Sequence, residues 1–419
     1  MLITRIKVKN FYGIKDAVEV KFIEGGKIDK SGYFKIASNQ RVSLINGFYG
    51  ANASGKSTIL NAMDKIIDLM LVKRPDFSVS PIGIQQETII CLPNYHVDAV
   101  KDPTELEIDF ISGNNKYAYK ICIINGRIIG REVFFRNGVR IFDRNKDSIV
   151  FPEKKYKQLG NTFKDYVLPK KSSFLSALLD GRIVSKDLEA VVGLNDIKAI
   201  RKKTCFITDK RAVALGQNNI GGLFAVFFNY INNADLNKEN YLNNINSIAK
   251  YFEPSLDKIV IKQKKSIDPN NIEADYGIKY KNCDKLLPIT EASAGTRELI
   301  AYINNILDIL KSGGVIVYDE TSKYYHPDME IAILNLFRDG DVNKNHAQIF
   351  FSSHNHATFD LLHNSQAHIM EKENDAITVN KVLDYDVKER DNIKKKYKAG
   401  SLGGVPDTID FNRIINNLL

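Results

Sequence analysis

The stretch Gly50–Ser57 is the feature that most constrains the fold. It reads Gly-Ala-Asn-Ala-Ser-Gly-Lys-Ser and matches G-x-x-x-x-G-K-S, the pattern of a phosphate-binding P-loop. An apolar run from Val42 to Asn46 precedes it and a helical pattern follows. The motif requires this strand–loop–helix context, because the phosphate sits at the start of the helix. A glycine-rich turn before an ordinary helix is the alternative, and the flanking segments favour the phosphate site.

Each part of the loop has a predicted role. The backbone N–H groups from Asn52 to Ser57 are expected to point at the anion, at the positive end of the following helix. Lys56 is expected to reach the β- and γ-phosphates, and Ser57 to ligate Mg²⁺. The predicted nucleotide-binding residues in this loop are Asn52, Ala53, Ser54, Gly55, Lys56, Ser57 and Thr58.

The composition indicates a globular chain without a membrane span. Hydrophobic residues make up 44% of 419, which is ample for a core. The four cysteines are far apart in sequence, so neither a disulfide framework nor a zinc site is expected. The amino terminus lacks the apolar region of a signal peptide, and the most apolar stretch, 221–231, is too short to cross a bilayer. We therefore expect a cytoplasmic location.

The first third of the chain predicts strands around one helix. Residues 1–24 contain two alternating segments typical of strands. The segment after Lys56 has apolar residues at helical spacing and is expected to end near Pro75. Residues 86–145 predict an antiparallel meander beside the nucleotide site, with a hairpin turn at Asn125-Gly126.

The middle of the chain differs in composition. Residues 150–255 are richer in Leu, Lys and Asn, and helical patterns occur around Leu175–Leu179 and Tyr241–Tyr251. We interpret this region as a helical insert without sustained heptads. Strand patterns return over 257–281.

Three further motifs follow the insert. Ser293-Ala-Gly295-Thr precedes an apolar helix, so its N–H groups form either a second anion-binding helix start or a simple serine cap. The apolar run ending in Asp319-Glu320 predicts a buried parallel strand that delivers two carboxylates to its edge. Asp319 suits Mg²⁺, and Glu320 suits the activation of an attacking water. A second buried strand ends at His354, which suits contact with a terminal phosphate.

In this order, the four motifs resemble those of the ABC-type ATPase heads, the class that includes SMC and RecF-like proteins. The matched parts are Walker A at Gly50–Ser57, the signature at Ser293–Thr296, Walker B with its catalytic glutamate at Val315–Glu320, and the switch histidine at His354. Three features resemble those of one bacterial family: the Ser-x-Gly-Thr-Arg form of the signature, the pair His326-Pro327 and the closing segment 395–406. This family comprises AAA-type ATPases with ABC-like sites, found in abortive-infection and phage-defence loci.

The resemblance implies an α/β fold, a P-loop NTPase with an ABC-type head. The head would have a mixed β-sheet core, an antiparallel β-subdomain and an inserted helical region. The domains would be 1–149, the first part of the head; 150–255, the helical insert; and 256–419, the rest of the head. Two features depart from the pattern: residues 323–326 read Lys-Tyr-Tyr-His after Walker B, and a Q-loop glutamine in 85–105 stays unassigned.

The resemblance also implies a mechanism. ATP and Mg²⁺ would be held at Lys56 and Ser57, with Ser293 and Gly295 of a second copy capping the γ-phosphate. Glu320 and His354 would be catalytic, and Ser57 and Asp319 would bind the metal. The resulting homodimer or higher oligomer is expected to switch a separate effector, such as a toxin or nuclease, in phage defence.

Two alternatives stay open. The net charge of +9 permits a DNA-bound repair or recombination ATPase of the RecF or SMC kind, although a solvated lysine-rich surface also explains the charge. The unusual 323–326 segment is compatible with a slow-turnover scaffold gated by ATP. No membrane partner is expected.

Overall fold

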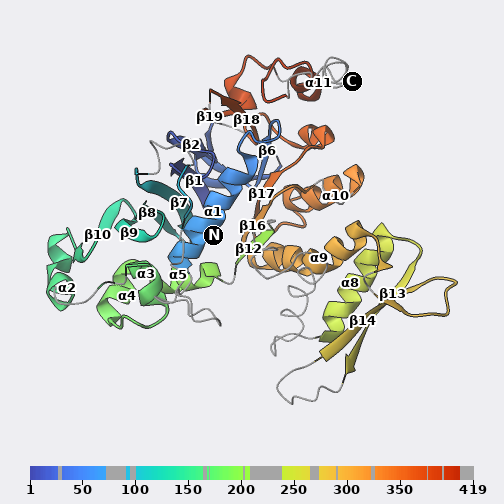
Figure 1. The fold of residues 1–419 in the computed structure, drawn as a ribbon, viewed down its shortest axis with the longest axis horizontal. Helices are drawn as coiled ribbons and strands as arrows, with labels where there is room; N and C mark the ends of the chain where they lie inside the picture. The colour runs from blue at the N-terminus through green and yellow to red at the C-terminus, as the bar shows by residue number, and fades with distance from the viewer. Residues whose placement is uncertain are drawn as a thin grey trace, which may run out of the picture.

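The structure is a computed structural model with mixed α/β architecture (Figure 1). Four sheets occur among the residues that it describes, two large and two of three strands. The described residues are 1–26, 31–71, 91–94, 101–163, 168, 170–201, 203–207, 238–264, 273–288, 291–321, 326–374, 376–388 and 391–405.

The central sheet carries the motif-bearing strands. Its order is β12 (Thr204–Ile207), β16 (Val315–Tyr318), β17 (Gln348–Ser352), β6 (Ile45–Tyr49), β18 (Ala367–Glu373) and β19 (Ala376–Lys381). All neighbours are parallel except the β18–β19 pair. Every residue of β6, β16 and β17 is buried, as expected for parallel strands covered on both faces. The buried strands predicted before Asp319 and His354 are therefore confirmed. The run Val42–Asn46 predicted before the P-loop is instead divided at Leu44 between β5 (Gln40–Ser43) of a small sheet and β6, which continues to Tyr49.

The second large sheet is the predicted meander. Its order is β11 (Ser148–Val150), β10 (Val139–Asn145), β9 (Ile128–Arg136), β8 (Asn115–Ile124), β7 (Thr104–Ser112), β1 (Leu2–Lys9) and β2 (Val18–Lys21), and all neighbours are antiparallel. Asn125 and Gly126 have φ values of 51° and 66°, which suits a tight turn between β8 and β9. The small sheet β3 (Ile23–Gly25), β5 (Gln40–Ser43) and β4 (Tyr33–Ala37) connects β2 to β6.

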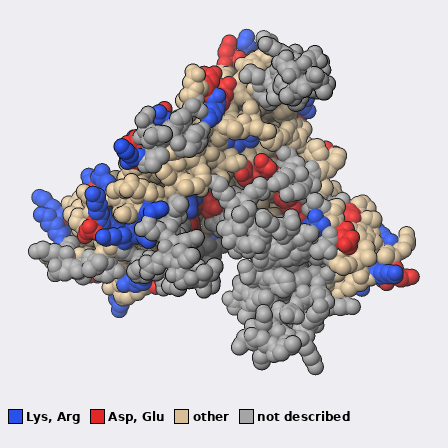
Figure 2. Space-filling view, viewed as in Figure 1, with Lys and Arg blue, Asp and Glu red and all other residues tan. Residues whose placement is uncertain are grey.

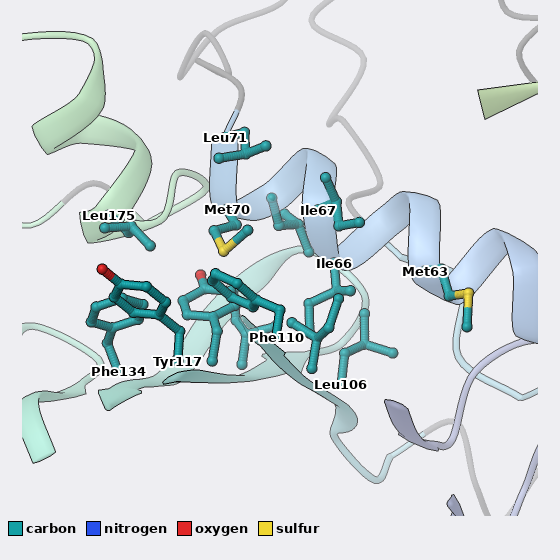
Figure 3. Close-up of a cluster of buried hydrophobic side chains, with 14 of the residues drawn as sticks. Met63, Ile66, Ile67, Met70, Leu71, Leu106, Phe110, Tyr117, Phe134 and Leu175 are labelled. Carbon is teal, nitrogen blue, oxygen red and sulfur yellow. The ribbon is translucent and has the colours of Figure 1, made fainter. Parts of the chain in front are cut away.

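Helix α1 (Lys56–Leu71) lies between the two large sheets and contacts β1 and β7 on one side and β16 and β17 on the other. Figure 3 shows Ile66, Ile67 and Met70 of α1 above Leu106 and Phe110 of the meander. All five side chains are buried. Each contributes about 1.5–3 kcal/mol relative to an exposed position, so the apolar face of α1 fixes the P-loop between the sheets.

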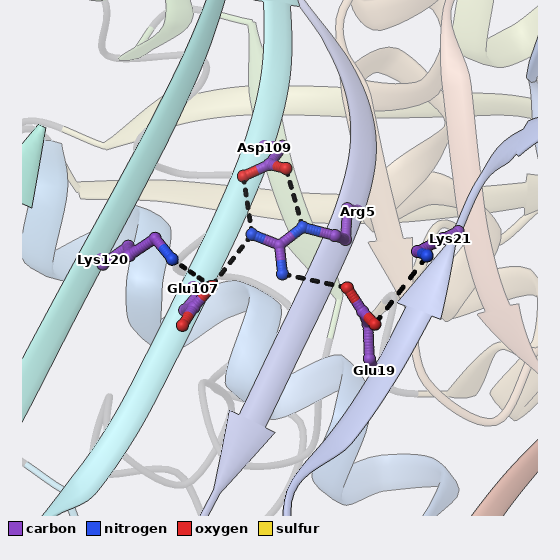
Figure 4. Close-up of polar contacts among 6 residues, drawn as sticks. All are labelled: Arg5, Glu19, Lys21, Glu107, Asp109 and Lys120. Atoms are coloured by element: carbon purple, nitrogen blue, oxygen red, sulfur yellow. Dashed lines mark hydrogen bonds and ion pairs between the residues drawn. The ribbon is translucent and has the colours of Figure 1, made fainter. Parts of the chain in front are cut away.

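The outward face of the meander is charged. Arg5 donates to Asp109 at 2.7 Å and 3.0 Å, to Glu107 at 2.9 Å and to Glu19 at 3.1 Å (Figure 4). Lys120 also pairs with Glu107 at 3.0 Å. The side chains of Arg5 and Glu107 are only 16% and 13% exposed, so this network ties β1, β2, β7 and β8 together on one face of the meander.

The 150–255 region is largely helical, but it also returns to the central sheet. Its described elements are η1 (Lys154–Tyr156), α2 (Lys157–Thr162), α3 (Phe174–Leu179), α4 (Lys186–Val192), α5 (Leu194–Arg201), β12 and α8 (Lys238–Phe252). The helices expected around Leu175–Leu179 and Tyr241–Tyr251 are confirmed by α3 and α8. Strand β12 was not expected, because a four-residue apolar segment among helical patterns gives a weak signal. Its edge position beside β16 extends the central sheet.

Helices α3 and α5 contact α1, so this part of the region packs on the head. The buried carboxylate of Glu132 accepts from the N–H groups of Phe174 at 2.7 Å and Leu175 at 3.1 Å. Burial raises the pKa of Glu132, and the Arg144 guanidinium at 3.5 Å opposes that shift. Glu132 therefore fixes the start of α3 to the meander. The boundaries of the three domains stay a prediction.

A separate lobe carries the second predicted helix start. It consists of α8, β13 (Leu256–Lys264), β14 (Glu273–Tyr280), β15 (Leu287–Pro288) and the first turns of α9 (Ala294–Ser312), and Figure 1 shows it projecting to one side of the central sheet. The strands expected over 257–281 are confirmed. The remaining elements are α10 (Pro327–Arg338), η3 (His356–Leu361), η4 (Val382–Asp384) and α11 (Ile393–Lys398).

Some expectations lie outside the described residues. They are the end of the first helix near Pro75, the start of the meander at 86–90, the apolar stretch 221–231 and the unusual residues Lys323–Tyr325. Among the residues that are described, none of the helices is both long and apolar enough to cross a membrane.

Candidate nucleotide site

The predicted P-loop lies between β6 and α1, at the carboxyl edge of the central sheet. Lys56 begins α1, and its Nζ donates to the carbonyl oxygens of Gly50 and Ala51 at 2.9 Å each. The backbone carbonyl groups of the loop thus hold the Lys56 ammonium above it. Burial lowers the pKa of Lys56, while the carboxylates of Asp319 and Glu320 oppose that shift. Lys56 therefore lies within electrostatic reach of both acids that follow β16.

The hydroxyl of Ser57 meets the first of these acids. Ser57 Oγ donates to Asp319 Oδ1 at 3.1 Å, which joins two residues 262 positions apart. Hydroxyl and carboxylate oxygens at the mouth of a P-loop are the hard ligands that Mg²⁺ takes together with phosphate oxygens and water. The donor set therefore fits Mg²⁺. In the described part of the chain, no group of three or more His, Cys, Asp and Glu side chains is arranged to hold a metal by itself.

Glu320 adopts an uncommon backbone conformation. Its φ is 55°, in the left-handed region that costs a non-glycine residue about 1–2 kcal/mol. Ser352, at the end of β17, holds this turn: its Oγ accepts from the Glu320 N–H at 2.8 Å and donates to Asp319 Oδ1 at 2.6 Å. One buried hydroxyl therefore orients both acids, a role that the sequence analysis missed.

The turn after Glu320 is tied to α10. Thr321 N–H donates to the carbonyl of Ser352 at 3.0 Å, and its hydroxyl donates to the buried carboxyl of Glu330. Burial raises the pKa of Glu330, and the hydrogen bond from Thr321 opposes the shift. His326 caps α10 by accepting from Asp328 N–H at 3.3 Å, so the His326-Pro327 pair marks the start of this helix.

His354 follows β17, the strand between β16 and β6. Partial burial and the Lys56 ammonium lower its pKa, while Glu320 and Asp319 oppose the shift. The shift favours the neutral imidazole, in which one ring nitrogen donates a hydrogen bond and the other accepts one. The structure brings together Lys56, Ser57, Asp319, Glu320 and His354 at one sheet edge.

The remaining predicted loop residues lie beside this group. Asn52 and Ala53 are exposed, and Ala53 has a φ of 63°. Ser54 N–H donates to the Ala51 carbonyl at 3.2 Å, and its buried hydroxyl has no hydrogen-bond partner among the described residues. Gly55 and Thr58 are half-buried. Their phosphate-binding roles stay a prediction.

The predicted signature lies at the start of α9. Ser293 is exposed and caps the helix by accepting from Thr296 N–H at 3.1 Å. Its hydroxyl is also 2.8 Å from the Thr296 hydroxyl, which donates to Glu253 just beyond the end of α8. These two hydrogen bonds, which the sequence analysis also missed, link the exposed Ser293 to the projecting lobe. The serine cap is confirmed and Ser293 is exposed, while the anion-binding role of this helix start stays a prediction.

The structure does not bring Ser293 and Gly295 to the P-loop of the same chain. Helix α9 packs on β12 and β16, and Tyr318 donates to Glu298 of α9 at 2.8 Å. The P-loop instead follows β6, and β17 separates β6 from β16. The start of α9 and the start of α1 therefore lie beside different strands of the central sheet.

Comparisons with known proteins give structural likenesses alone. No family model matches the chain, and no match was found among curated proteins. An SMC head bound to the C-winged helix domain of ScpA aligns with a TM-score of 0.43 and 14% identity, covering 91% of this chain and 97% of that one. An SMC head domain from Thermotoga maritima gives 0.40 and 12%, covering 91% and 99%. A third, from Pyrococcus yayanosii with a coiled coil and joint, gives 0.42 and 11%, covering 95% and 99%.

Proposed function

We propose that this chain binds and hydrolyses ATP at an ABC-type site that two copies complete. The observation that carries the proposal is the hydrogen bond between Ser57 and Asp319, beside Lys56. It joins a P-loop to an acid at the end of a second parallel strand, as magnesium-dependent phosphoryl transfer requires. The order of the parallel strands supports the assignment to the P-loop NTPase class, and we propose the boundaries 1–149, 150–255 and 256–419 for its parts.

The residues take distinct roles in this mechanism. Lys56 would exchange its bonds to the Gly50 and Ala51 carbonyls for the terminal phosphates, and Ser57 and Asp319 would hold Mg²⁺. The metal, when bound, neutralises charge that develops on the transferred phosphoryl group. Glu320 would orient a water in line with the γ-phosphate and accept its proton. His354, whose pKa the Lys56 ammonium helps to lower, would donate a hydrogen bond to the γ-phosphate.

The second copy would supply the remaining contacts. Ser293 is exposed at the start of a 19-residue helix, where backbone N–H groups favour an anion. Ser293 does not lie at Lys56 of its own chain. A two-fold dimer would bring the two together, with the signature of each copy capping the P-loop of the other. Hydrolysis would then remove the charge that holds the copies together.

Sizing with and without ATP tests this function. Glu320→Gln keeps the binding residues but removes the proposed base, so ATP should shift it from monomer to dimer or larger. Lys56→Ala should abolish the shift. Wild type should release phosphate from ATP faster than Glu320→Gln. A size that never changes would reject the closing dimer, and a wild type without turnover would favour the slow scaffold.

We propose phage defence as the biological setting, with the dimer switching a separate effector. The support is the family resemblance of the motifs and of the closing segment 395–406. Co-purification of the wild type with the product of a neighbouring gene, weakened by Lys56→Ala, would support it. Protection of cells by this chain alone would contradict the separate effector.

A DNA-binding repair or recombination role is the second candidate. Figure 2 shows Lys and Arg side chains gathered on the side of the molecule where β9, β10 and α2 lie. Phosphate contacts would make binding fall steeply with salt. An ATPase rate that no DNA changes, together with no salt-sensitive DNA binding, would reject this role.

A further inference from the structure

The closing segment, defined as Tyr397–Gly404, packs against the first residue of the P-loop. A Cβ placed on Gly404 would lie 3.4 Å from Gly50 Cα and 3.3 Å from the Met370 carbonyl oxygen. A Cβ placed on Gly50 would lie 2.4 Å from that same oxygen. Both glycines therefore face the Met370 carbonyl of β18, which leaves little room for a side chain at either position. The nearest atom to that Gly404 Cβ is Ile369 Cγ2 at 2.7 Å, so a side chain added at Gly404 must displace Ile369 of β18 and acts on the P-loop through this strand.

A hydrogen-bonded frame holds the segment in this place. Gly404 N–H donates to Glu371 Oε1 at 2.9 Å, and Tyr397 donates its hydroxyl proton to the Gly404 carbonyl at 3.0 Å. Both backbone groups of Gly404 are thus engaged, one from β18 and one from α11. Gly404 has a φ of 68°, which glycine adopts without strain.

The ring of Tyr397 extends the frame to the segment after β17. It lies 5.1 Å from the ring of Phe359 and 5.2 Å from that of His356, both in η3. It also lies 6.4 Å from the ring of Tyr49, the residue immediately before the P-loop. Tyr49 itself stacks on Phe359 at 4.0 Å. One buried tyrosine thus joins the start of the P-loop to the segment that follows His354.

We propose that Tyr397–Gly404 is a positioning element for the nucleotide site. It holds Gly50 against β18 and keeps the P-loop in register with the His354 segment, so that ATP binds to a preformed loop. This inference rests on the proposed ATP site but assigns no chemistry to the closing segment. Loss of the contact should raise the Kd for ATP and the KM, and leave kcat at saturating ATP nearly unchanged, since no residue of the segment touches the reacting atoms.

Two glycines of the segment provide a matched test. Gly400 has a φ of 75°, close to the 68° of Gly404, but a Cβ there would meet nothing within 4 Å. Gly400→Ala and Gly404→Ala therefore impose the same backbone strain, and only Gly404→Ala also pushes on Ile369 and Met370 of β18, the strand that contacts Gly50. The probe is N-methylanthraniloyl-ATP with the full chain, measured by fluorescence, with thermal melting of each variant without nucleotide. Gly404→Ala should raise the Kd about tenfold, and Gly400→Ala less than about twofold.

Tyr397→Phe keeps the test open if Gly404→Ala does not fold. It removes the 3.0 Å hydrogen bond to Gly404 and keeps the ring contacts, so the Kd should rise about threefold, with only the small loss of melting temperature that one buried hydrogen bond accounts for. Equal Kd values for Gly404→Ala and Gly400→Ala would overturn the inference. If Gly404→Ala fails to fold, a Tyr397→Phe affinity equal to that of wild type would overturn it. A wild type that binds no nucleotide would instead reject the ATP site itself.

Discussion

Ser352→Ala is the substitution whose effects the site geometry predicts in most detail. The Ser352 hydroxyl is fully buried, donates to Asp319 at 2.6 Å and accepts from Glu320 N–H at 2.8 Å. A hydrogen bond to a charged group is worth about 1.5–3 kcal/mol, and a neutral one about 1 kcal/mol. Alanine removes both, and burial leaves little room for water to replace the oxygen.

The total loss of about 2–4 kcal/mol should divide between folding and catalysis. Glu320 would lose the contact that holds it at a φ of 55°, so the proposed base would leave its position for part of the time. If half of the loss raises the activation barrier, kcat falls about 10-fold. The Kd for ATP should change less than about threefold, because Lys56 and Ser57 are untouched.

Ser353→Ala is the matched control. Ser353 is adjacent and buried; its hydroxyl accepts from Asn355 N–H at 2.9 Å and also hydrogen-bonds to Glu330, and neither bond involves Asp319 or Glu320. Both variants should lose stability in urea unfolding, but only Ser352→Ala should lose most of its steady-state ATPase rate. Equal kcat values for the two variants would refute the assignment of Ser352 to the orientation of Asp319 and Glu320.

Three further predictions concern the signature, the core and the link between the meander and α3. Thr296→Val should weaken the ATP-dependent dimer about tenfold in sedimentation without changing nucleotide binding, since its hydroxyl supports the exposed serine cap. Burial lowers the pKa of His368 to about 3, against about 6.5 when unfolded, so the unfolded state binds more protons in that window. The unfolding free energy should therefore fall by about 1.4 kcal/mol per pH unit below pH 6.5, and His368→Phe should flatten this slope in urea unfolding. Glu132→Ala should reduce the unfolding free energy by about 3–5 kcal/mol, because it leaves Arg144 buried without its carboxylate; a loss under about 1 kcal/mol would contradict this account.

The sequence predicts those parts of the fold whose signals are local. Strands β16 and β17 are short apolar runs that end in polar residues, and α1 has apolar residues at helical spacing, so pattern alone identifies them. Strand β12 escapes prediction because its four residues become a strand only beside β16. Here pairing across the sheet decides the conformation, and no local pattern contains that information.

The same limit applies to the site. Lys56, Ser57, Asp319 and Glu320 belong to motifs with fixed internal spacing, which chain order makes recognisable. Ser352 is an ordinary serine at a strand end, and its role depends on partners 32 and 33 residues earlier. The Ser-Ser pair before the strand-end histidine was the available signal, but serines there are common and have many uses.

The closing segment shows a related limit. The sequence marks its glycines only through a family resemblance. Their contact with Gly50 depends on how β18 and α11 fold back on the P-loop. Pairing between segments about 350 residues apart has no counterpart in local propensity.

Mixing two inactive variants tests the central claim, a site completed by a second copy, most directly. Lys56→Ala lacks the P-loop lysine, and Ser293→Arg lacks the signature serine, so neither should hydrolyse ATP alone. Only a mixed dimer has an intact site, one of its two, so an equal mixture should hydrolyse ATP at up to about half of the wild-type rate. A mixture no faster than the average of the two separate variants would contradict the composite site.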